Sequence, residues 1–191
     1  GTGGTHRRSE PRPSPTSAVL VALADTHGTD DPRLAGRAAE AVADADLLVH
    51  AGDLTTGRVL DALRDRADVR AVHGNADDEA VRERLPRTLV VTYAGVRIAV
   101  THRRRGGATA LSLLGRERGA DLVVFGHSHR PTVAARPVTL CNPGSHADPR
   151  GAPPTHAELR STDAGLGGRV VTRGGDVVER FRVEGGAGRD G

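Results

Sequence analysis

The sequence contains little of what several classes of protein require. One cysteine, Cys141, is present among 191 residues, so no internal disulfide can form and a disulfide-rich secreted scaffold is excluded. Aromatic residues make up 2% of the chain, too few for the stacked rings on which single-stranded nucleic acid binds. No apolar run approaches the roughly 20 residues that a membrane-spanning helix needs. The core must therefore be built from Val, Leu and Ala, and the length predicts one domain.

Lysine is also absent, and the net charge of +3 arises mostly at one end of the chain. Arg7, Arg8 and Arg12 stand against Glu10, which accounts for +2 of the +3. The remainder is close to neutral, so the composition predicts no broad surface for binding nucleic acid.

One segment resembles a secretory signal, because Arg7 and Arg8 precede the apolar residues 17–24 (SAVLVALA). That run is at the lower limit of length for a signal, and three prolines precede it. We therefore expect a buried strand there and a cytoplasmic location.

The chain between its two ends has the pattern of an α/β domain. Residues 1–16 and 185–191 are rich in Gly and Arg without periodicity, which predicts disordered tails around a domain at 17–184. Helical spacing of apolar residues predicts helices at 32–46, 56–66, 78–85 and 108–119. Apolar runs predict strands at 19–24, 47–50, 69–73, 89–93, 96–101, 122–125, 131–135, 138–141, 156–161, 170–173 and 177–183. This order predicts two sheets packed together with helices outside.

Each early strand ends in residue types that bind metal ions. The side chains in question are Asp25, His27, Asp53, Asn75, His102, His127 and His129. Ligands of open α/β sheets bind beyond the carboxyl ends of the strands, so we expect these seven side chains in one place. Glycines beside them (Gly28, Gly52, Gly74 and Gly126) would let the backbone turn sharply and approach an ion closely.

Seven oxygen and nitrogen donors are more than one tetrahedral zinc needs and suit two first-row ions that share a carboxylate. Imidazole-rich ligation favours Mn, Fe, Co, Ni or Zn over Mg²⁺ or Ca²⁺. Two such ions about 3.5–4 Å apart can hold both the attacking and the leaving oxygen of an in-line displacement at phosphorus.

The ordered set of motifs resembles the calcineurin-like metallophosphoesterase superfamily, in particular its small single-domain bacterial and archaeal phosphodiesterase branch. The motifs are Asp25-x-His27, Gly52-Asp53, Gly74-Asn75, His102, Gly126-His127-x-His129 and Asn142-Pro143-Gly144-Ser145, and the match covers about residues 19–150. The eukaryotic retromer subunit of the vacuolar-sorting type is similar in fold. The resemblance implies a four-layer αββα sandwich of two mixed sheets flanked by helices.

The resemblance also implies a role for each position. Asp25, His27 and His129 would hold one metal, Asn75, His102 and His127 would hold a second, and Asp53 would bridge both. Asp53, Asn75 and His102 would be catalytic, and residues 142–145 would form a supporting loop. The implied reaction is hydrolysis of a small phosphate ester, most plausibly a diester, by in-line attack of a hydroxide held by two divalent ions, with Mn favoured. No membrane partner is expected, and nucleic acid is expected only as a substrate.

Two departures from the family pattern keep other functions open. Ala76 stands where many relatives have a histidine that protonates the leaving group, and the carboxyl of Asp77 follows it. Residues 103–105 are all arginine where relatives often have Gly-His. A solvated charge run is the favoured interpretation of these arginines, and a bidentate phosphate contact is the alternative. A non-catalytic metal-binding interaction scaffold and a phosphomonoesterase therefore remain alternatives to the phosphodiesterase.

The remaining histidines and the cysteine are expected to be structural. His50 and His73 lie inside predicted strands, where we expect them to pack or form hydrogen bonds. His6, His146 and His156 receive the same interpretation, and Cys141 is expected to be an inert core residue.

Overall fold

The computed structural model describes residues 19–135 and 137–186. Most of the two predicted tails lies outside these residues, and the described residues 185 and 186 belong to neither helix nor strand. Within the described part, none of the helices is long and apolar enough to cross a membrane.

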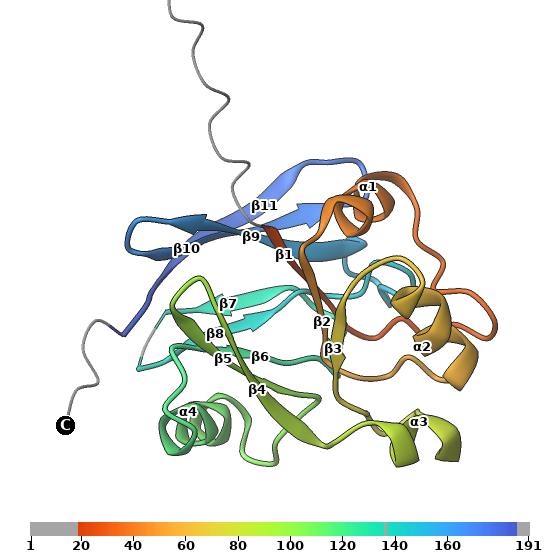
Figure 1. Cartoon of the computed structure of the whole chain (residues 1–191), viewed down its shortest axis with the longest axis horizontal. Coiled ribbons are helices and arrows are strands. Elements are labelled where there is room, and N and C mark those ends of the chain that lie inside the picture. The colour runs from red at the N-terminus through yellow and green to blue at the C-terminus, as the bar shows by residue number, and fades with distance from the viewer. Residues whose placement is uncertain (1–18, 136, 187–191) are drawn as a thin grey trace, which may run out of the picture.

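Two mixed sheets face each other (Figure 1). The six-stranded sheet has the order β11-β10-β9-β1-β2-β3, and the five-stranded sheet has the order β4-β5-β6-β8-β7. The strands of the first sheet are β1 (Val19–Leu23), β2 (Leu47–His50), β3 (Val69–Ala71), β9 (Thr155–Thr162), β10 (Gly165–Thr172) and β11 (Val177–Glu184). Those of the second are β4 (Thr88–Tyr93), β5 (Val96–Thr101), β6 (Leu122–Val124), β7 (Thr132–Ala134) and β8 (Thr139–Asn142).

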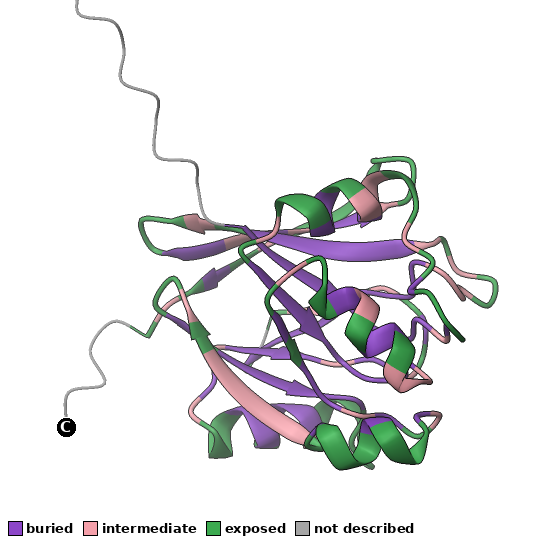
Figure 2. Cartoon of the chain, turned by 45° about the vertical axis from the view of Figure 1, so that its right-hand side comes forward, coloured by how far each residue is buried: buried purple, intermediate pink, exposed green. Residues whose placement is uncertain are grey.

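The helices lie on the outer faces of the two sheets. They are α1 (Gly36–Asp44), α2 (Gly57–Arg64), α3 (Glu79–Arg84) and α4 (Gly107–Glu117). Helix α1 packs on β1, β9 and β10, whereas α4 packs on β6 and β8 (Figure 1). Figure 2 shows the strands largely buried and the outward faces of the helices exposed. The predicted αββα sandwich is therefore confirmed.

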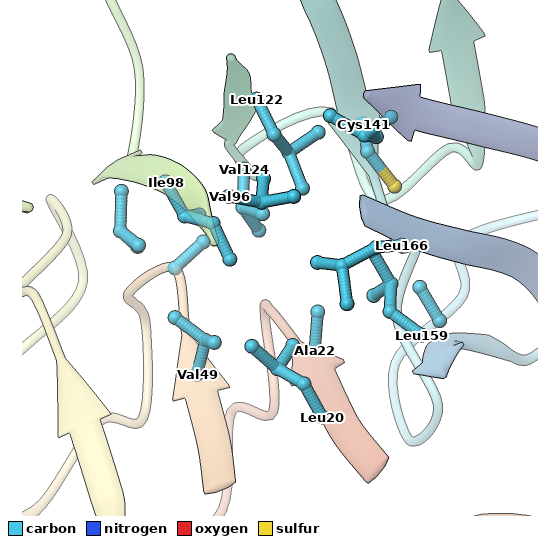
Figure 3. Packing of buried hydrophobic residues seen from close by; sticks show 14 of the residues in the cluster. Leu20, Ala22, Val49, Val96, Ile98, Leu122, Val124, Cys141, Leu159 and Leu166 are labelled. Atoms are coloured by element: carbon cyan, nitrogen blue, oxygen red, sulfur yellow. The ribbon is translucent and has the colours of Figure 1, made fainter. Parts of the chain in front are cut away.

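The main core lies between the sheets and is made of aliphatic side chains. Leu20 and Val49 of the first sheet face Val96 and Ile98 of the second (Figure 3). Cys141 is fully buried in the same cluster, as predicted. Smaller clusters under α1 and α2 and under α4 complete the four layers.

The first predicted helix and the third predicted strand were too long, each for a local reason, and the strand predicted at 170–173 was too short, because β10 covers Gly165–Thr172. The first helix begins at Gly36 rather than at residue 32, because Arg33 has a left-handed φ of 52° and Ala35 is extended, with a φ of −147°. Strand β3 ends at Ala71 rather than at His73. The backbone N–H of His73 donates to Pro86 instead of to the sheet, so the prediction that His73 lies inside a strand was wrong.

Parallel pairing sets the common direction of the site-bearing strands. Strands β1, β2 and β3 run parallel in one sheet, and β5, β6 and β8 run parallel in the other. The loops that follow β1, β2, β3, β5 and β6 carry the seven candidate ligands.

Candidate metal centre

The structure brings the seven predicted ligands together at the carboxyl ends of these strands. We refer to Asp25, His27 and His129 as the inner group and to Asn75, His102 and His127 as the outer group, with Asp53 between them. The ligand atoms of the inner group all lie within 4.8 Å of one another. The same is true of Asp25, Asp53 and His102, so both carboxylates serve as links between the groups.

The inner group is packed tightly around the carboxylate of Asp25. Oδ1 of Asp25 lies 3.5 Å from Nε2 of His129 and 3.9 Å from Nε2 of His27. The rings of His27 and His129 stack with their centroids 4.9 Å apart. Asp25 is fully buried and His129 is 2% exposed, so solvent hardly reaches this side of the site.

The outer group meets at the amide oxygen of Asn75. Oδ1 of Asn75 lies 3.0 Å from Nε2 of His102 and 3.0 Å from Nδ1 of His127. Oδ2 of Asp53 lies 3.2 Å from Nε2 of His102 and 3.4 Å from Nε2 of His27, which places this carboxylate between the two groups. Asn75 is exposed and His127 is half-buried, so this side of the site opens to solvent.

Backbone carbonyls orient two of the imidazoles as ligands. The ring N–H at Nδ1 of His102 donates to the carbonyl of Ala51 over 2.8 Å. Nδ1 of His129 likewise donates to the carbonyl of Asp148. Because a neutral imidazole carries one proton, each ring presents the lone pair of Nε2 to the aspartates, which is the arrangement of a metal ligand.

Two buried polar atoms in the site lack any partner that protein groups could supply. Oδ1 of Asp25 and Nε2 of His27 are buried and accept or donate no hydrogen bond within the described residues. A buried polar group without a partner is costly, and it calls for an ion or a water molecule. The seven donors fit divalent metal ions, because a cation among them satisfies both atoms and offsets the charge of the two carboxylates.

Burial and neighbouring charges set the protonation of the carboxylates. Burial raises the pKa of Asp25, although the charges of His102 and His129 oppose that shift. Burial acts in the same direction on Asp53, but the nearby imidazoles of His102 and His27 and the backbone N–H of Ala76 outweigh it and hold the pKa of Asp53 well below its usual range. Asp53 therefore stays ionised.

The ligands themselves sit on strained backbone. Among the described residues, nine that are not glycine have a positive φ, and five of them are candidate ligands: Asp25, His27, Asp53, His127 and His129. A left-handed conformation costs such a residue about 1–2 kcal/mol, and strain of this kind gathers at functional sites.

The glycines beside the ligands have two different roles. Gly52 has a φ of 94°, so it supplies the sharp turn that was predicted. A Cβ on Gly74 would instead come within 2.2 Å of Oδ1 of Asp53, so this glycine leaves room for the carboxylate.

Asp77 organises the turns of the site rather than facing a substrate. Its carboxylate is buried and accepts the backbone N–H groups of Asp53, Thr55 and Gly74 over 3.0, 2.7 and 2.6 Å. The sequence alone does not show how far this carboxyl reaches, and these three hydrogen bonds remove it as a donor to the leaving group. An aspartate three residues after the glycine of a turn was the available signal, since such side chains often bond nearby backbone.

The loop of residues 142–145 supports the site as predicted. Nδ2 of Asn142 donates to the carbonyl of Gly126, and Oγ of Ser145 donates to the carbonyl of Asp25 over 2.7 Å. All four residues of the loop are buried. The loop therefore fixes the ligand-bearing turns and presents no side chain to a substrate.

The arginine run after His102 is only partly a solvated charge run. Nη1 of Arg103 donates to Nε2 of His127 over 3.1 Å. Nη2 of Arg104 lies 3.8 Å from Oε2 of Glu117. Burial and the charge of His102 lower the pKa of His127, and the charge of Arg103 adds to that shift.

The other described histidines lie outside the ligand set, and only His73 lies outside the strand in which it was expected. His50 is fully buried, accepts the N–H of Gly52 at Nδ1 and donates from Nε2 to Thr26, and burial lowers its pKa to about 3. His146 and His156 are buried against Pro32 and Glu158. His73 is half-buried beside the site, and His6 lies outside the described residues.

The sequence matches a known protein family and two curated relatives. Residues 19–164 match the family model for the calcineurin-like phosphoesterase superfamily domain. The chain is 34% identical over 167 residues to a protein named "probable metallophosphoesterase" from Methanothermobacter thermautotrophicus, covering 83% of this chain and 95% of the relative. It is 37% identical over 138 residues to a protein of the same description from Methanocaldococcus jannaschii, covering 69% and 70%.

Solved structures share the fold at lower sequence identity. Vps29 of Chaetomium thermophilum superposes with a TM-score of 0.72 at 19% identity, over 88% of this chain and 97% of that one. A protein described as a novel archaeal phosphodiesterase superposes with a TM-score of 0.62 at 19% identity, over 81% and 99%. At these identities the likeness concerns the fold alone.

Proposed function

The chain belongs to the calcineurin-like phosphoesterase superfamily, and from that premise we propose that this metal-dependent phosphoesterase is a phosphodiesterase acting on a small phosphate ester. The observation that carries the proposal is the pair of buried, partnerless atoms, Oδ1 of Asp25 and Nε2 of His27, within a cluster of seven donors. The fold shared with a described archaeal phosphodiesterase favours a diester over a monoester.

The residues have separable tasks in this proposal. The inner group with Asp53 would hold one divalent ion, and the outer group with Asp53 would hold the other. When bound, two such ions lower the pKa of a water molecule and neutralise charge that develops on the phosphate oxygens. Asp53 is suited to lie between them because it is ionised and because its Oδ1 is fixed by the N–H of Ala76 over 2.8 Å.

Neither of the two residues that follow Asn75 is placed to protonate the leaving oxygen. Ala76 has no proton to give, and the carboxylate of Asp77 is buried against three backbone N–H groups. Because general acid catalysis contributes about 10²–10⁴-fold where it operates, esters whose leaving groups depart without a proton should react best.

A non-catalytic scaffold is the second candidate, and the same alanine favours it. A protein that only binds metal and partners has no need of a proton donor at this position. The complete set of seven donors weighs against the scaffold, because a protein that binds metal only to support an interaction surface does not need every ligand of a two-ion site. Manganese as the resident metal and a cytoplasmic location stay predictions.

Hydrolysis of bis(p-nitrophenyl) phosphate with Mn²⁺ tests the proposal. Wild-type protein should release nitrophenol in a metal-dependent manner, and Asp53→Asn or His129→Ala should abolish it. Asp163→Asn, in the exposed turn between β9 and β10, is the matched control and should retain full activity. Metal analysis of the same samples completes the test. Bound metal without turnover of diesters or monoesters would establish the scaffold instead.

A further inference from the structure

A cavity rich in arginine adjoins the outer group. It has a volume of about 820 Å³, and Asn75 and His102 form part of its wall. Five arginines from four segments of the chain line it, and no acidic residue among the described residues does: Arg82, Arg87, Arg103, Arg104 and Arg118. The near-neutral composition of the chain gives no hint of this local concentration of charge.

Two of the five arginines have charges that no neighbour offsets. Arg82 donates to the carbonyl of Asn75 over 2.9 Å, and Arg103 and Arg104 have the contacts with His127 and Glu117 given above. The guanidinium groups of Arg87 and Arg118 form no salt bridge or hydrogen bond with any residue that the structure describes.

The two arginines come from different elements of the fold. Arg87 immediately precedes β4, and Arg118 immediately follows α4. Thr88 and Thr101, whose hydroxyls lie 3.4 Å apart, form part of the wall with them. Like charges gathered in a concave wall repel one another and attract an anion, and guanidinium matches the geometry of phosphate in bidentate fashion.

We infer that the natural substrate carries a second phosphate group in addition to the ester that is hydrolysed, and that Arg87 and Arg118 bind this second phosphate. The inference rests on the proposed function, because it places the scissile phosphate at the outer group and Asp53. The volume of the cavity accommodates a nucleotide-sized molecule, so small phosphoesters with two or more phosphates are the substrate class.

Calorimetric titration of the metal-free protein tests the cavity without relying on turnover. The probes are adenosine 3′,5′-bisphosphate and adenosine 5′-monophosphate, which differ by one phosphate. The bisphosphate should bind about ten-fold or more tightly than the monophosphate, as expected for added charge-assisted hydrogen bonds. That advantage should shrink at high salt, because exposed charges are screened.

Variants assign the effect to the two arginines. The double variant Arg87→Ala/Arg118→Ala should lose the preference for the bisphosphate, and it should fold because both side chains are exposed. Arg116→Ala is the matched control, since Arg116 is exposed near the end of α4 and does not line this cavity. Equal affinity of wild-type protein for both probes, or a preference that survives in the double variant, would overturn the inference.

The hydrolysis assay separates this inference from the proposed function. A wild-type protein that hydrolyses bis(p-nitrophenyl) phosphate but does not prefer the bisphosphate retains its function and refutes the second-phosphate site. A protein that hydrolyses no diester but prefers the bisphosphate through Arg87 and Arg118 keeps the anion site, and it refutes both the proposed function and the assignment of the second phosphate to a substrate.

Discussion

The inner and outer groups of the site use similar ligands in opposite surroundings. Asp25 and His129 are buried, and the ring of His129 is held by a backbone carbonyl. Asn75 is exposed, and five arginines line the cavity beside it. Carboxylates in a buried site attract a cation, whereas nearby guanidinium groups repel it. From this difference we propose that the inner side retains an ion and that the outer side admits an anionic substrate.

Removing one histidine from each group gives the largest expected effects and tests this contrast directly. His129→Ala should lower kcat/KM by about 10³-fold at any metal concentration, because it removes a ligand from a buried ion site. His127→Ala should cost about 10–100-fold and should recover in part at high Mn²⁺. Steady-state kinetics over a range of Mn²⁺ concentrations checks both. Equal losses of kcat/KM in the two variants, with the same response to added Mn²⁺, would contradict the proposed difference between the inner and outer groups.

Asp77→Asn should weaken both groups together, because this carboxylate ties the turn that carries Asp53 to the turn that carries Asn75. An amide oxygen cannot accept all three N–H groups, so we expect about a 10–100-fold loss of activity and a loss of about 2 kcal/mol in the free energy of unfolding. Denaturant unfolding and diester hydrolysis measure these changes.

The adjacent Asp78→Asn is the control for this variant. Asp78 caps α3 by accepting the N–H of Val81, and asparagine caps a helix equally well. Stability and activity should therefore be unchanged. If Asp77→Asn and Asp78→Asn behave alike, Asp77 does not have the organising role given to it here.

Arg103→Ala should have a smaller effect than the substitutions above, and it should strengthen metal binding at the outer group instead of weakening it. Removing this exposed cation and its hydrogen bond to His127 should raise the affinity of the outer group for Mn²⁺ about three-fold, with the inner group unchanged. Calorimetric titration with Mn²⁺ resolves the weaker of the two binding events. A decrease in that affinity would show that Arg103 supports the outer group instead of opposing its ion.

The charge of Glu158 should affect the stability of the protein but not its affinity for metal. Glu158 is 1% exposed, and its carboxylate accepts hydrogen bonds from Arg37 and Arg169. Nε2 of His156 lies 2.9 Å from Oε1 of the same carboxylate. Burial alone would raise the pKa of Glu158, but these partners lower it well below the usual range. Glu158→Gln should lower the free energy of unfolding by about 3 kcal/mol at pH 7 and leave metal affinity unchanged.

The pH dependence of that loss follows from the sign of the shift. Because the pKa is lower in the folded state, the stabilisation is complete above the ordinary value of 4.5 and is lost as the pH falls toward the native value. The difference in Tm between wild type and Glu158→Gln should therefore be largest near pH 7 and shrink below about pH 4.5. A difference that grows as the pH falls would contradict the assignment.

The sequence allowed the convergence of the candidate ligands to be predicted because each lies in the loop that follows a strand. Parallel strands bring their carboxyl ends together, so order along the chain was enough to gather Asp25, Asp53, Asn75, His102 and the two histidines after β6. The hairpin at residues 94 and 95 was equally local, since both residues adopt positive φ.

What the sequence did not reveal depends on contacts between distant loops. The bonds from Asp77 to two turns, and from the guanidinium of Arg33 to the carbonyls of Thr26 and His27, require the folded chain. The arginine cavity was hidden because acidic residues elsewhere balance the total charge while none of them lines this wall.

We expect the inner and outer groups to hold two ions joined by Asp53, and the electron paramagnetic resonance spectrum of the Mn²⁺-loaded protein tests this expectation. Two Mn²⁺ should bind per chain and give an exchange-coupled spectrum, which Asp53→Asn converts into that of isolated ions. A wild-type protein that binds at most one Mn²⁺, or whose two ions show no coupling, would contradict it.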